Sequence, residues 1–448
     1  MAERMKAVAA AGAVAAFWLA AWVFAAALVA QPLILPGPGA VVVALLRLVC
    51  DASTWAILMG SGARILGGLA LAAVCGGVLA GVSVRSCAFA RLVAPALSFV
   101  KATPVACVVV LLLIWLGSAR VSIAAVFLMA LPGVYFSLVE GLAQVDKPLE
   151  QMFRLHGVRG WRLFCAHTWR EVLPFVLSCA RAVIGMSWKA GVAAELIGMA
   201  VGTVGERIYQ AKLLIETADL LAWTVLVVMA SWACERVLVW LLRASGPAAW
   251  RAAVLSHGRG LRGRAGAADV AELALAVGDR APWAPALDGL VLNVPAGGRI
   301  CVMGTSGVGK STLLALAAGE CAPCSMVFQD VRLVEGASAL DNVLVCADAR
   351  VDASSAAALL RLLVPGVDVH ARVAELSGGQ RRRVEIARAL LCPGGAVILD
   401  EPFTGLDTAA RDACAEVVLD LLVGRMLLLA THDAVDAQAL NISDIITL

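Results

Sequence analysis

The chain has 448 residues, of which 61% are hydrophobic and 15% are charged, and its mean hydropathy is +0.88. Soluble globular proteins carry about 25% charged residues, so this composition excludes a wholly soluble chain. The charge is unevenly divided, because residues 266–448 hold 13 basic and 22 acidic residues whereas residues 1–265 hold 23 basic and 11 acidic ones. This pattern predicts a basic membrane domain, in contact with anionic lipid, joined to an acidic water-facing domain. The basic residues are scattered around apolar stretches, so we expect no nucleic-acid partner.

Uncharged apolar stretches predict six membrane-spanning helices in the first half of the chain. The first stretch is too long for the apolar core of a cleaved signal peptide, and further spans follow it. Basic residues such as Arg91 and Lys101 fall in predicted loops that are cytoplasmic if the N-terminus is inside. The positive-inside rule therefore predicts a multi-pass protein of the cytoplasmic (inner) membrane with both termini in the cytoplasm. The predicted spans are residues 7–30, 65–84, 102–119, 121–139, 174–200 and 220–242.

The fifth predicted span is unusual because it contains three charged residues, Arg181, Lys189 and Glu195. On an α-helix these three side chains share one face of about 120°. Charges inside a span line a polar pathway, or extend to the lipid headgroups when they lie near the helix ends. The sequence leaves both interpretations open.

Two cytoplasmic segments connect the predicted parts. Residues 141–173 are too long for a simple turn and have helical apolar spacing, so they form either a structured contact surface or an ordinary amphipathic connector. Residues 244–268 are rich in Gly, Ala and Arg and are predicted to be a linker. The predicted domains are therefore a helical membrane domain (1–243), a linker (244–268) and a soluble domain (269–448).

A phosphate-binding loop opens the soluble half. The pattern Gly-x-x-x-x-Gly-Lys-Ser follows a strand-like stretch and precedes a helix-forming run, which is the context that this loop requires. Backbone N–H groups and the helix N-terminus bind phosphate, Lys310 supplies a positive charge, and the Ser311 hydroxyl is placed to bind Mg²⁺. The predicted ATP-binding residues are Gly304, Thr305, Ser306, Gly307, Val308, Gly309, Lys310, Ser311 and Thr312.

Two further apolar runs end in polar residues. Residues 396–399 precede Asp400 and Glu401, and residues 427–430 precede Thr431 and His432. The carboxyl ends of parallel strands face the ligand crevice, so these side chains are predicted to meet the nucleotide. Asp400 is expected to hold Mg²⁺, Glu401 to orient and deprotonate the attacking water, and His432 either to contact the γ-phosphate or to be structural.

These motifs occur in the order found in ATP-binding-cassette (ABC) ATPases. The soluble half carries the phosphate loop, "FQD" with Gln329, "LSGGQ" at 376–380, "ILDEP", "TGLD" with Asp407, and "THD" with His432. The membrane half resembles the permeases of bacterial importers for nitrate, sulfonates, taurine and thiamine-type pyrimidine precursors. That resemblance rests on "LPGPGAV" at 35–41, "FVKATPV" at 99–105 and residues 172–198. The expected fold is an all-α six-helix permease followed by an α/β P-loop ATPase.

The resemblance implies a mechanism in which two ATPase domains close head to tail on two ATP molecules. Gln329, Glu401 and His432 are implied to be catalytic, Gln329 is implied to hold Mg²⁺ with Ser311 and Asp400, and Asp407 is implied to lie at the dimer contact. One permease and one ATPase per chain imply a homodimer, served by a periplasmic or lipid-anchored substrate-binding protein. The residues implied to contact the partner's ATP are Leu376, Ser377, Gly378, Gly379 and Gln380.

The sequence departs from the family pattern in the cytoplasmic loop and in the nucleotide domain. The usual E-A-A-x-x-x-G is replaced by Gln151-Met152-Phe153 and Gly157, with Glu150 adjacent. Only 17 residues separate Ser311 from Gln329, so the small antiparallel sheet between them is expected to be trimmed. No aromatic residue lies at the usual adenine-stacking position near 277–278, and Trp283 is either its substitute or an ordinary surface or core tryptophan.

The leading functional prediction is an ATP-driven importer of a small polar nutrient. An exporter is disfavoured because, apart from residues 141–173, the inner loops are short. A non-transporting membrane ATPase stays open because the cytoplasmic loop is altered. Cys321 and Cys324 form a C-x-x-C pair, but no second pair or histidine lies nearby to complete a zinc site.

Overall fold

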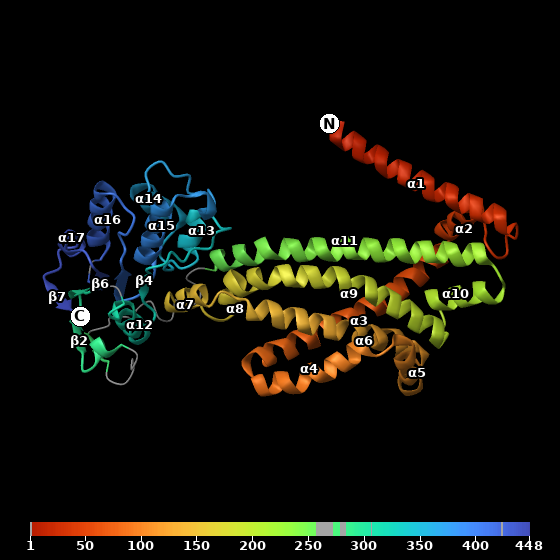
Figure 1. Ribbon diagram of the computed structural model, residues 1–448, viewed down its shortest axis with the longest axis horizontal. Helices are drawn as coiled ribbons and strands as arrows, with labels where there is room; N and C mark the ends of the chain where they lie inside the picture. Colours follow the sequence, from red (N-terminus) through yellow and green to blue (C-terminus); the bar gives the residue numbers. More distant parts are fainter. Residues whose placement is uncertain (1, 257–271, 278–283, 306, 423) are drawn as a thin grey trace. The chain divides into compact units, whose positions relative to one another are not determined.

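The protein is described by a computed structural model covering residues 2–256, 272–277, 284–305, 307–422 and 424–448 (Figure 1). The chain forms two compact units. The helical unit contains residues 1–144 and 172–245, and the α/β unit contains residues 145–171 and 246–448. The predicted fold class, a helical membrane-type domain followed by an α/β domain with a parallel sheet, is confirmed.

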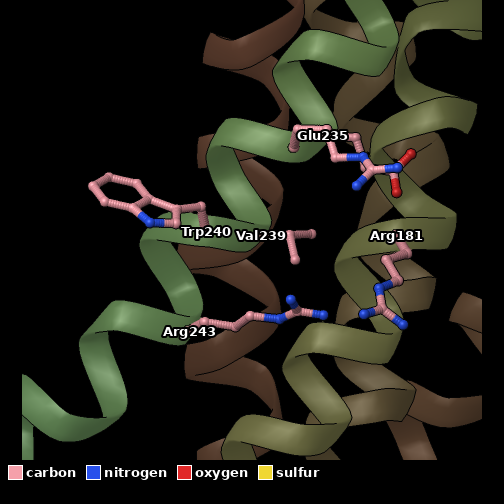
Figure 2. A pocket seen from close by; sticks show the side chains of 6 residues that line it. Arg181, Glu235, Val239, Trp240 and Arg243 are labelled. Carbon is pink, nitrogen blue, oxygen red and sulfur yellow. The ribbon is translucent and has the colours of Figure 1, made fainter. Parts of the chain in front are cut away.

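The helical unit consists of long apolar helices. By length and composition, five described helices can cross a membrane, or up to six if a bent pair of helices counts as one span. Figure 2 shows α9 and α11 at the level of Arg181 and Arg243. The helices are α1 (Ala2–Val29), α2 (Pro38–Cys50), α3 (Ala52–Arg85), α4 (Cys87–Ala102), α5 (Val105–Leu116), α6 (Ser118–Ala143), α9 (Trp169–Gly198), α10 (Val204–Leu213) and α11 (Thr217–Leu255), the last crossing into the other unit after Ser245.

The bent pair corrects one predicted span. The uncharged stretch 102–119 contains only α5, whose 12 residues are too few to cross about 30 Å of hydrocarbon. Because Pro104 interrupts the helix and restricts Thr103 to an extended conformation, α5 turns by 103° from α4. Arg91 and Lys101, predicted to lie in loops, are instead part of α4.

Glycines allow the central helices to approach closely. A Cβ atom on Gly68 of α3 would lie 2.5 Å from the carbonyl oxygen of Ile123 in α6. A Cβ atom on Gly191 of α9 would lie 2.5 Å from the side chain of Ile65 in α3. Because association within lipid depends on such close packing, α3, α6 and α9 form the packed centre of the helical unit.

A five-stranded parallel sheet forms the centre of the α/β unit, with strand order β4-β5-β6-β3-β7. The strands β5 and β6 are buried along their whole length, as expected of a parallel sheet covered on both faces. An antiparallel pair, β1 with β2, lies outside it. The strands are β1 (Glu272–Ala276), β2 (Val291–Pro295), β3 (Arg299–Met303), β4 (Ser325–Val327), β5 (Ala396–Asp400), β6 (Met426–Thr431) and β7 (Asp444–Thr447).

Helices complete the α/β unit around this sheet. Between Ser311 and Gln329 the chain forms only α12, a short connection and parallel β4, so no antiparallel strand lies in this stretch, all of which the structure describes. The helices are α12 (Lys310–Glu320), α13 (Ala339–Leu344), α14 (Ala353–Leu363), α15 (Gly378–Leu391), α16 (Thr408–Leu421) and α17 (Ala434–Ala439), with 3₁₀ turns η3 (Pro285–Leu287) and η4 (Val373–Glu375).

Residues 145–171 are part of the α/β unit although they are distant from it in sequence. They form α7 (Lys147–Leu155), α8 (Gly160–Leu163) and the π-helical turn η1 (Phe164–Thr168). Met152 and Phe153 are fully buried in the core of this unit. The predicted linker is helical at its start, since α11 continues to Leu255, and residues 257–268 lie outside the described residues.

Candidate nucleotide-binding site

The predicted phosphate loop connects β3 to α12 at the carboxyl edge of the parallel sheet. Gly307 and Gly309 have φ angles of +85° and +112°, which only glycine adopts readily. A Cβ atom on Gly304 would lie 2.9 Å from the side chain of Val308, so this position also requires glycine. Ser306 lies outside the described residues. The loop therefore has the compact form that exposes backbone N–H groups to a phosphate.

Lys310 is held against this loop. Its ammonium group donates hydrogen bonds to the carbonyl oxygens of Gly304, at 2.7 Å, and Thr305, at 3.1 Å. The side chain is nearly buried, with a relative exposure of 6%. The positive charge is thus fixed at the point where phosphates would lie.

Asp400 ends β5 beside the start of α12. It is buried, and burial raises the pKa of its carboxyl while the hydrogen bond from Ser311 and the charge of Lys310 oppose that rise. A buried carboxylate in this position favours a nearby cation. The carboxylate and the Ser311 hydroxyl are both hard oxygen donors of the kind that Mg²⁺ prefers, so the residues present fit this ion.

Glu401 and His432, which follow neighbouring strands, meet at the same edge. The Nδ1 atom of His432 lies 3.3 Å from Oε1 of Glu401. Glu401 has a left-handed backbone with φ of +47°, an uncommon conformation for a non-glycine residue. Its backbone N–H donates to the carbonyl oxygen of Ala430 at 2.8 Å and so fixes this conformation. Backbone strain of this kind is concentrated at functional sites.

Gln329 lies two residues after β4, the strand that pairs with β5, so it follows the same edge of the sheet as Asp400. Its side chain is exposed. Its carbonyl oxygen accepts a hydrogen bond of 2.6 Å from Arg382, which also donates to the carbonyl oxygens of Phe328 and, at 3.4 Å, Glu401. Arg382 therefore ties two of the predicted catalytic residues to one helix.

That helix is α15, and the predicted signature segment forms its N-terminus. Ser377 is the N-cap and forms a capping box with Gln380: its hydroxyl accepts from the backbone N–H of Gln380 at 3.3 Å, and its own N–H donates to the Gln380 side chain at 2.9 Å. Ser377 and Gly378 are exposed, whereas Leu376 and Gly379 are half-buried. The 14-residue helix thus presents a capped, positive end that is open to an anion.

Asp407 is also an N-cap, at the start of α16. Its carboxylate accepts a hydrogen bond of 2.7 Å from the backbone N–H of Ala410. Its neighbour Leu406 lies 3.3 Å from where a Cβ atom on Gly379 would be, so this corner contacts the signature segment.

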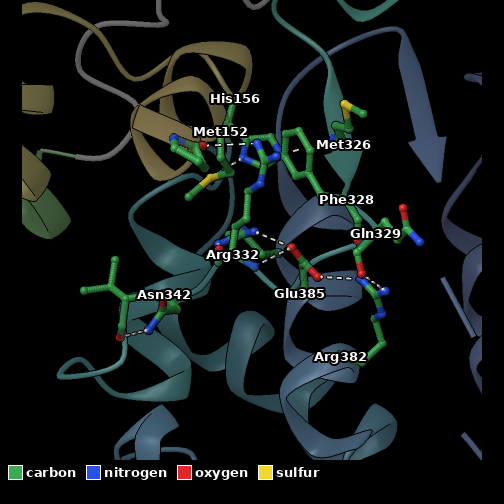
Figure 3. Close-up of polar contacts among 12 residues, drawn as sticks. Met152, His156, Met326, Phe328, Gln329, Arg332, Asn342, Arg382 and Glu385 are labelled. Carbon is green, nitrogen blue, oxygen red and sulfur yellow. Dashed lines mark hydrogen bonds and ion pairs between the residues drawn. The ribbon is translucent and has the colours of Figure 1, made fainter. Parts of the chain in front are cut away.

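A buried charge network behind the site was not predicted (Figure 3). The carboxylate of Glu385 accepts from Arg382 at 2.9 Å, from Arg388 at 3.3 Å and from the backbone N–H of Arg332 at 3.1 Å. Burial raises the pKa of Glu385, and the two guanidinium groups oppose this rise. The i, i+3 spacing of these charges on α15 was a usable signal, but the sequence did not reveal that they are buried.

The segment 145–171 contacts the same region. The Leu155 carbonyl oxygen accepts from the N–H of Cys324 at 3.0 Å, and Nε2 of His156 accepts from the N–H of Met326 at 3.1 Å. His156 is fully buried, and burial, with the charge of Arg388, lowers its pKa well below the usual value. A neutral imidazole is therefore part of the contact between α7 and β4, the edge strand of the sheet.

The three charges of the fifth predicted span are not brought together. Glu195 is fully buried and accepts from Ser61 at 2.8 Å and from Arg64 at 3.3 Å, so the proposed extension of Glu195 to the headgroups is wrong. Arg181 and Lys189 are exposed on α9. These contacts of Glu195 tie α9 to α3.

Other predicted features have different outcomes. Cys321 and Cys324 are buried, and burial raises the pKa of their thiols to about 11 and about 12, so both are protonated at neutral pH. Gly278 and Trp283, considered for adenine stacking, lie outside the described residues.

Comparison with known families matches both halves of the chain. Residues 73–251 match the family model described as "Binding-protein-dependent transport system inner membrane component". Residues 322–404, which include the signature segment and Glu401, match the model described as "ABC transporter".

Individual relatives match the α/β unit. The chain is 35% identical over 182 residues to an aliphatic sulfonates import ATP-binding protein of Rhizobium johnstonii, covering 35% of this chain and 66% of that protein. It is 38% identical over 182 residues to a taurine import ATP-binding protein of Chromobacterium violaceum, covering 34% and 68%. The chain thus spans about two thirds of the length of these relatives. A solved dimeric bacterial ABC transporter cassette is 24% identical, with a TM-score of 0.33, over 36% of this chain and 86% of that one.

Proposed function

Because the chain belongs to the ABC transporters, with a binding-protein-dependent permease region and an ABC ATPase in one polypeptide, we propose that it is an ATP-driven importer of a small polar nutrient. The names of its relatives make aliphatic sulfonates and taurine the first candidates, ahead of nitrate and pyrimidine precursors. We keep residues 1–243, 244–268 and 269–448 as the proposed permease, linker and ATPase regions of the sequence.

One observation carries this proposal. The segment 145–171 lies between membrane-spanning helices in sequence, yet it packs into the core of the ATPase unit and hydrogen-bonds to its edge strand β4. Gln329 lies two residues after β4, and β4 contacts this segment. A movement of Gln329 at the nucleotide site would therefore be transmitted to the segment through β4. The altered motif at Gln151-Met152-Phe153 keeps the contact, because Met152 and Phe153 are buried in it. This favours coupled transport over a non-transporting ATPase.

The geometry supports the following hydrolytic roles. Residues 304–312 are proposed to bind the phosphates of ATP, with Lys310 supplying the positive charge. Ser311, Asp400 and Gln329 are proposed to hold Mg²⁺, which supplies charge neutralisation at the β- and γ-phosphates. Glu401 is proposed to orient and deprotonate the attacking water, with His432 beside it at 3.3 Å.

A second copy of the chain is proposed to complete each site. At the N-terminus of α15, within residues 376–380, Ser377 and Gly378 are exposed. We propose that this segment contacts the γ-phosphate held by the partner, with Asp407 at the dimer contact. ATP binding would close this homodimer, and hydrolysis would reopen it. A substrate-binding protein outside the membrane is proposed to deliver the nutrient, with both termini of the chain in the cytoplasm.

The test is ATP hydrolysis by the purified chain in lipid, with native mass recorded. We expect Glu401→Gln to lower the rate by about 10²–10⁴-fold through loss of the base. The Ser377→Arg variant should lower the rate as strongly by blocking the partner's phosphate. Glu416→Gln and Ser354→Arg, at exposed positions on α16 and α14, are the matched controls and should leave the rate unchanged. Hydrolysis by a monomer that is insensitive to Ser377→Arg would contradict the shared site.

Uptake of labelled taurine into proteoliposomes, with a candidate binding protein added outside, tests the transport proposal. ATP-dependent uptake that is lost in Glu401→Gln supports it. ATP hydrolysis without uptake of any sulfonate, nitrate or pyrimidine precursor would favour the non-transporting ATPase.

A further inference from the structure

The helical unit contains a hollow of about 420 Å³ between α9 and α11. It is lined by three arginines, one glutamate and two apolar residues (Figure 2). In this view the side chain of Arg243 extends from α11 toward α9, and the side chain of Arg181, from α9, ends at a similar level. The lining residues are Arg181, Glu235, Arg236, Val239, Trp240 and Arg243.

Among the residues that the structure describes, the positive charge of this hollow is only partly balanced. Three guanidinium groups face one carboxylate, that of Glu235. Arg236 stacks its guanidinium over Trp232 at 5.2 Å, whereas neither Arg181 nor Arg243 has a hydrogen bond or ion pair to any residue in the described ranges. Charges within membrane-spanning helices are normally paired or mark a ligand site.

Guanidinium groups from two directions suit one class of ligand. Each presents a planar fork of N–H donors that matches the oxygens of a phosphate or sulfonate group. The volume of the hollow is within the range of small-ligand sites, which begins at about 300 Å³. A carboxylate would fit two arginines less fully than a tetrahedral group with three or more oxygens.

The surroundings indicate what is attached to the anion. Beside the hollow, α11 exposes large apolar side chains, including Trp232 and Leu241. Trp240 is also exposed at the edge of the hollow, and in Figure 2 its indole points away from Arg181. The arginines of α11 follow the uncharged stretch 220–234, so they lie at one end of the apolar span. Tryptophan and arginine at this level are typical of the membrane interface, where lipid phosphates lie.

We propose that Arg181 and Arg243, with Arg236 beside them, form a binding site for a tetrahedral oxyanion, and that the phosphate of an anionic lipid headgroup occupies it. The acyl chains then lie on the exposed apolar face of α11. A free sulfonate would satisfy the same guanidinium groups, and in that case the hollow is a binding site on the path of the transported anion. The site rests on these side chains alone and does not depend on the proposed import activity.

The experiment uses the full-length chain in detergent after removal of its native lipid. Native mass spectrometry measures binding of phosphatidylglycerol and phosphatidylcholine, and thermal unfolding measures stabilisation by each lipid, by inorganic phosphate and by methanesulfonate. The chain is compared with Arg181→Gln/Arg243→Gln and with Arg181→Lys/Arg243→Lys, which keeps the charge. Arg91→Gln, at an exposed position of α4, is the matched control.

We expect one tightly bound phosphatidylglycerol per chain, with at least a tenfold weaker affinity in the double glutamine variant and partial recovery in the double lysine variant. Arg91→Gln should bind as the unchanged chain does. If methanesulfonate or phosphate stabilises the lipid-free chain, and this stabilisation is lost in the double glutamine variant, the oxyanion site is supported but its occupant is a free anion. Equal binding of phosphatidylglycerol and phosphatidylcholine, or equal behaviour of the double glutamine variant and the unchanged chain, would overturn the proposal. A double glutamine variant whose unfolding temperature without ligand matches that of the unchanged chain shows that lost binding is not lost folding.

Discussion

The two units each bury a glutamate completely, but they balance its charge in different ways. In the helical unit, Glu195 is balanced by one guanidinium, that of Arg64, whose side chain remains 28% exposed. In the α/β unit, Glu385 is balanced by Arg382 and Arg388, whose side chains are 4% and 1% exposed. The carboxylate of Glu195 connects two helices, α9 and α3, whereas the carboxylate of Glu385 pairs with two arginines of its own helix, α15.

This difference separates two kinds of buried ion pair. When both members of an ion pair are buried, removing either one leaves the other buried without a counter-charge, at a cost of about 3–5 kcal/mol. A partner that is partly exposed can turn outward when it is released, so the loss of the carboxylate costs less. Replacing each glutamate should therefore destabilise its unit by a different amount, and the first two of four predictions, which run from the largest effect to the smallest, test this. The other two concern weaker interactions of the segment 145–171.

The largest effect is expected for Glu385→Ala. It leaves two buried guanidinium groups without a counter-charge and the N–H of Arg332 without its acceptor, which should destabilise the α/β unit by about 3–5 kcal/mol. Because Arg382 also holds the carbonyl oxygens of Gln329 and Glu401, ATP hydrolysis should fall as well. The reactivity of the buried thiols of this unit, such as Cys301 and Cys414, measures its opening by mass spectrometry. Thiol protection equal to that of the unchanged chain would show that the arginines find other partners.

A smaller effect is expected for Glu195→Ala. It removes the acceptor of Ser61, of Arg64 and of the Gly205 backbone N–H but leaves the partly exposed Arg64 side chain free to turn outward, so a loss of about 1–3 kcal/mol in the helical unit is expected. Labelling of Cys179 and Cys234 should rise while that of Cys301 stays unchanged. A loss as large as that of Glu385→Ala would mean that exposure of the arginine does not decide the cost.

The third prediction concerns pH. The folded protein holds His156 neutral, with a pKa well below 6.5, whereas the unfolded chain protonates it near pH 6.5. The unfolded state thus binds more protons below this pH, so the α/β unit should lose stability as the pH falls below about 6.5, by up to about 1.4 kcal/mol per pH unit. His156→Gln keeps an acceptor for the N–H of Met326 and should remove this part of the pH dependence. An unchanged slope would place its origin elsewhere.

The smallest effect is expected for Glu150→Ala. Its carboxylate pairs with Arg154 at 2.6 Å on the surface of α7, and such i, i+4 pairs contribute about 0.3–0.5 kcal/mol. Thermal unfolding and ATP hydrolysis should be nearly unchanged. A strong loss of hydrolysis or transport would instead give Glu150 the role of the acid missing from the usual loop motif.

The nucleotide site was largely predictable because its chemistry follows from local sequence. A loop with glycine at three positions, a lysine at a helix start, and acids at the ends of apolar strands can each be recognised in a short stretch of chain. Because β4 and β5 pair in parallel, Gln329 and Asp400, which lie at the ends of these strands, are at the same edge of the sheet. Ser377 was predictable for the same reason, since its capping box with Gln380 spans three residues.

Features that depend on distant contacts were not predictable. Glu195 contacts residues more than 130 positions away, so its burial did not follow from the helical face that it shares with Arg181. The 103° turn after α4 came from Pro104 acting on a helix that hydropathy alone reads as continuous. His156 gave no signal, because a lone histidine in a loop has no spacing that reveals the strand against which it packs.

The α/β unit is discontinuous in the sequence, since residues 172–245, which belong to the helical unit, separate residues 145–171 from the rest of it. A version of the ATPase that starts at the linker, as a separately encoded subunit would, lacks the hydrogen-bond acceptors for Cys324 and Met326 and the side chains of Met152 and Phe153. Cutting the gene at that point would therefore divide one folding core between two products. If this ATPase is replaced by one from another system, residues 145–171 must be replaced together with it. These 27 residues therefore limit how the two halves of the chain can be recombined.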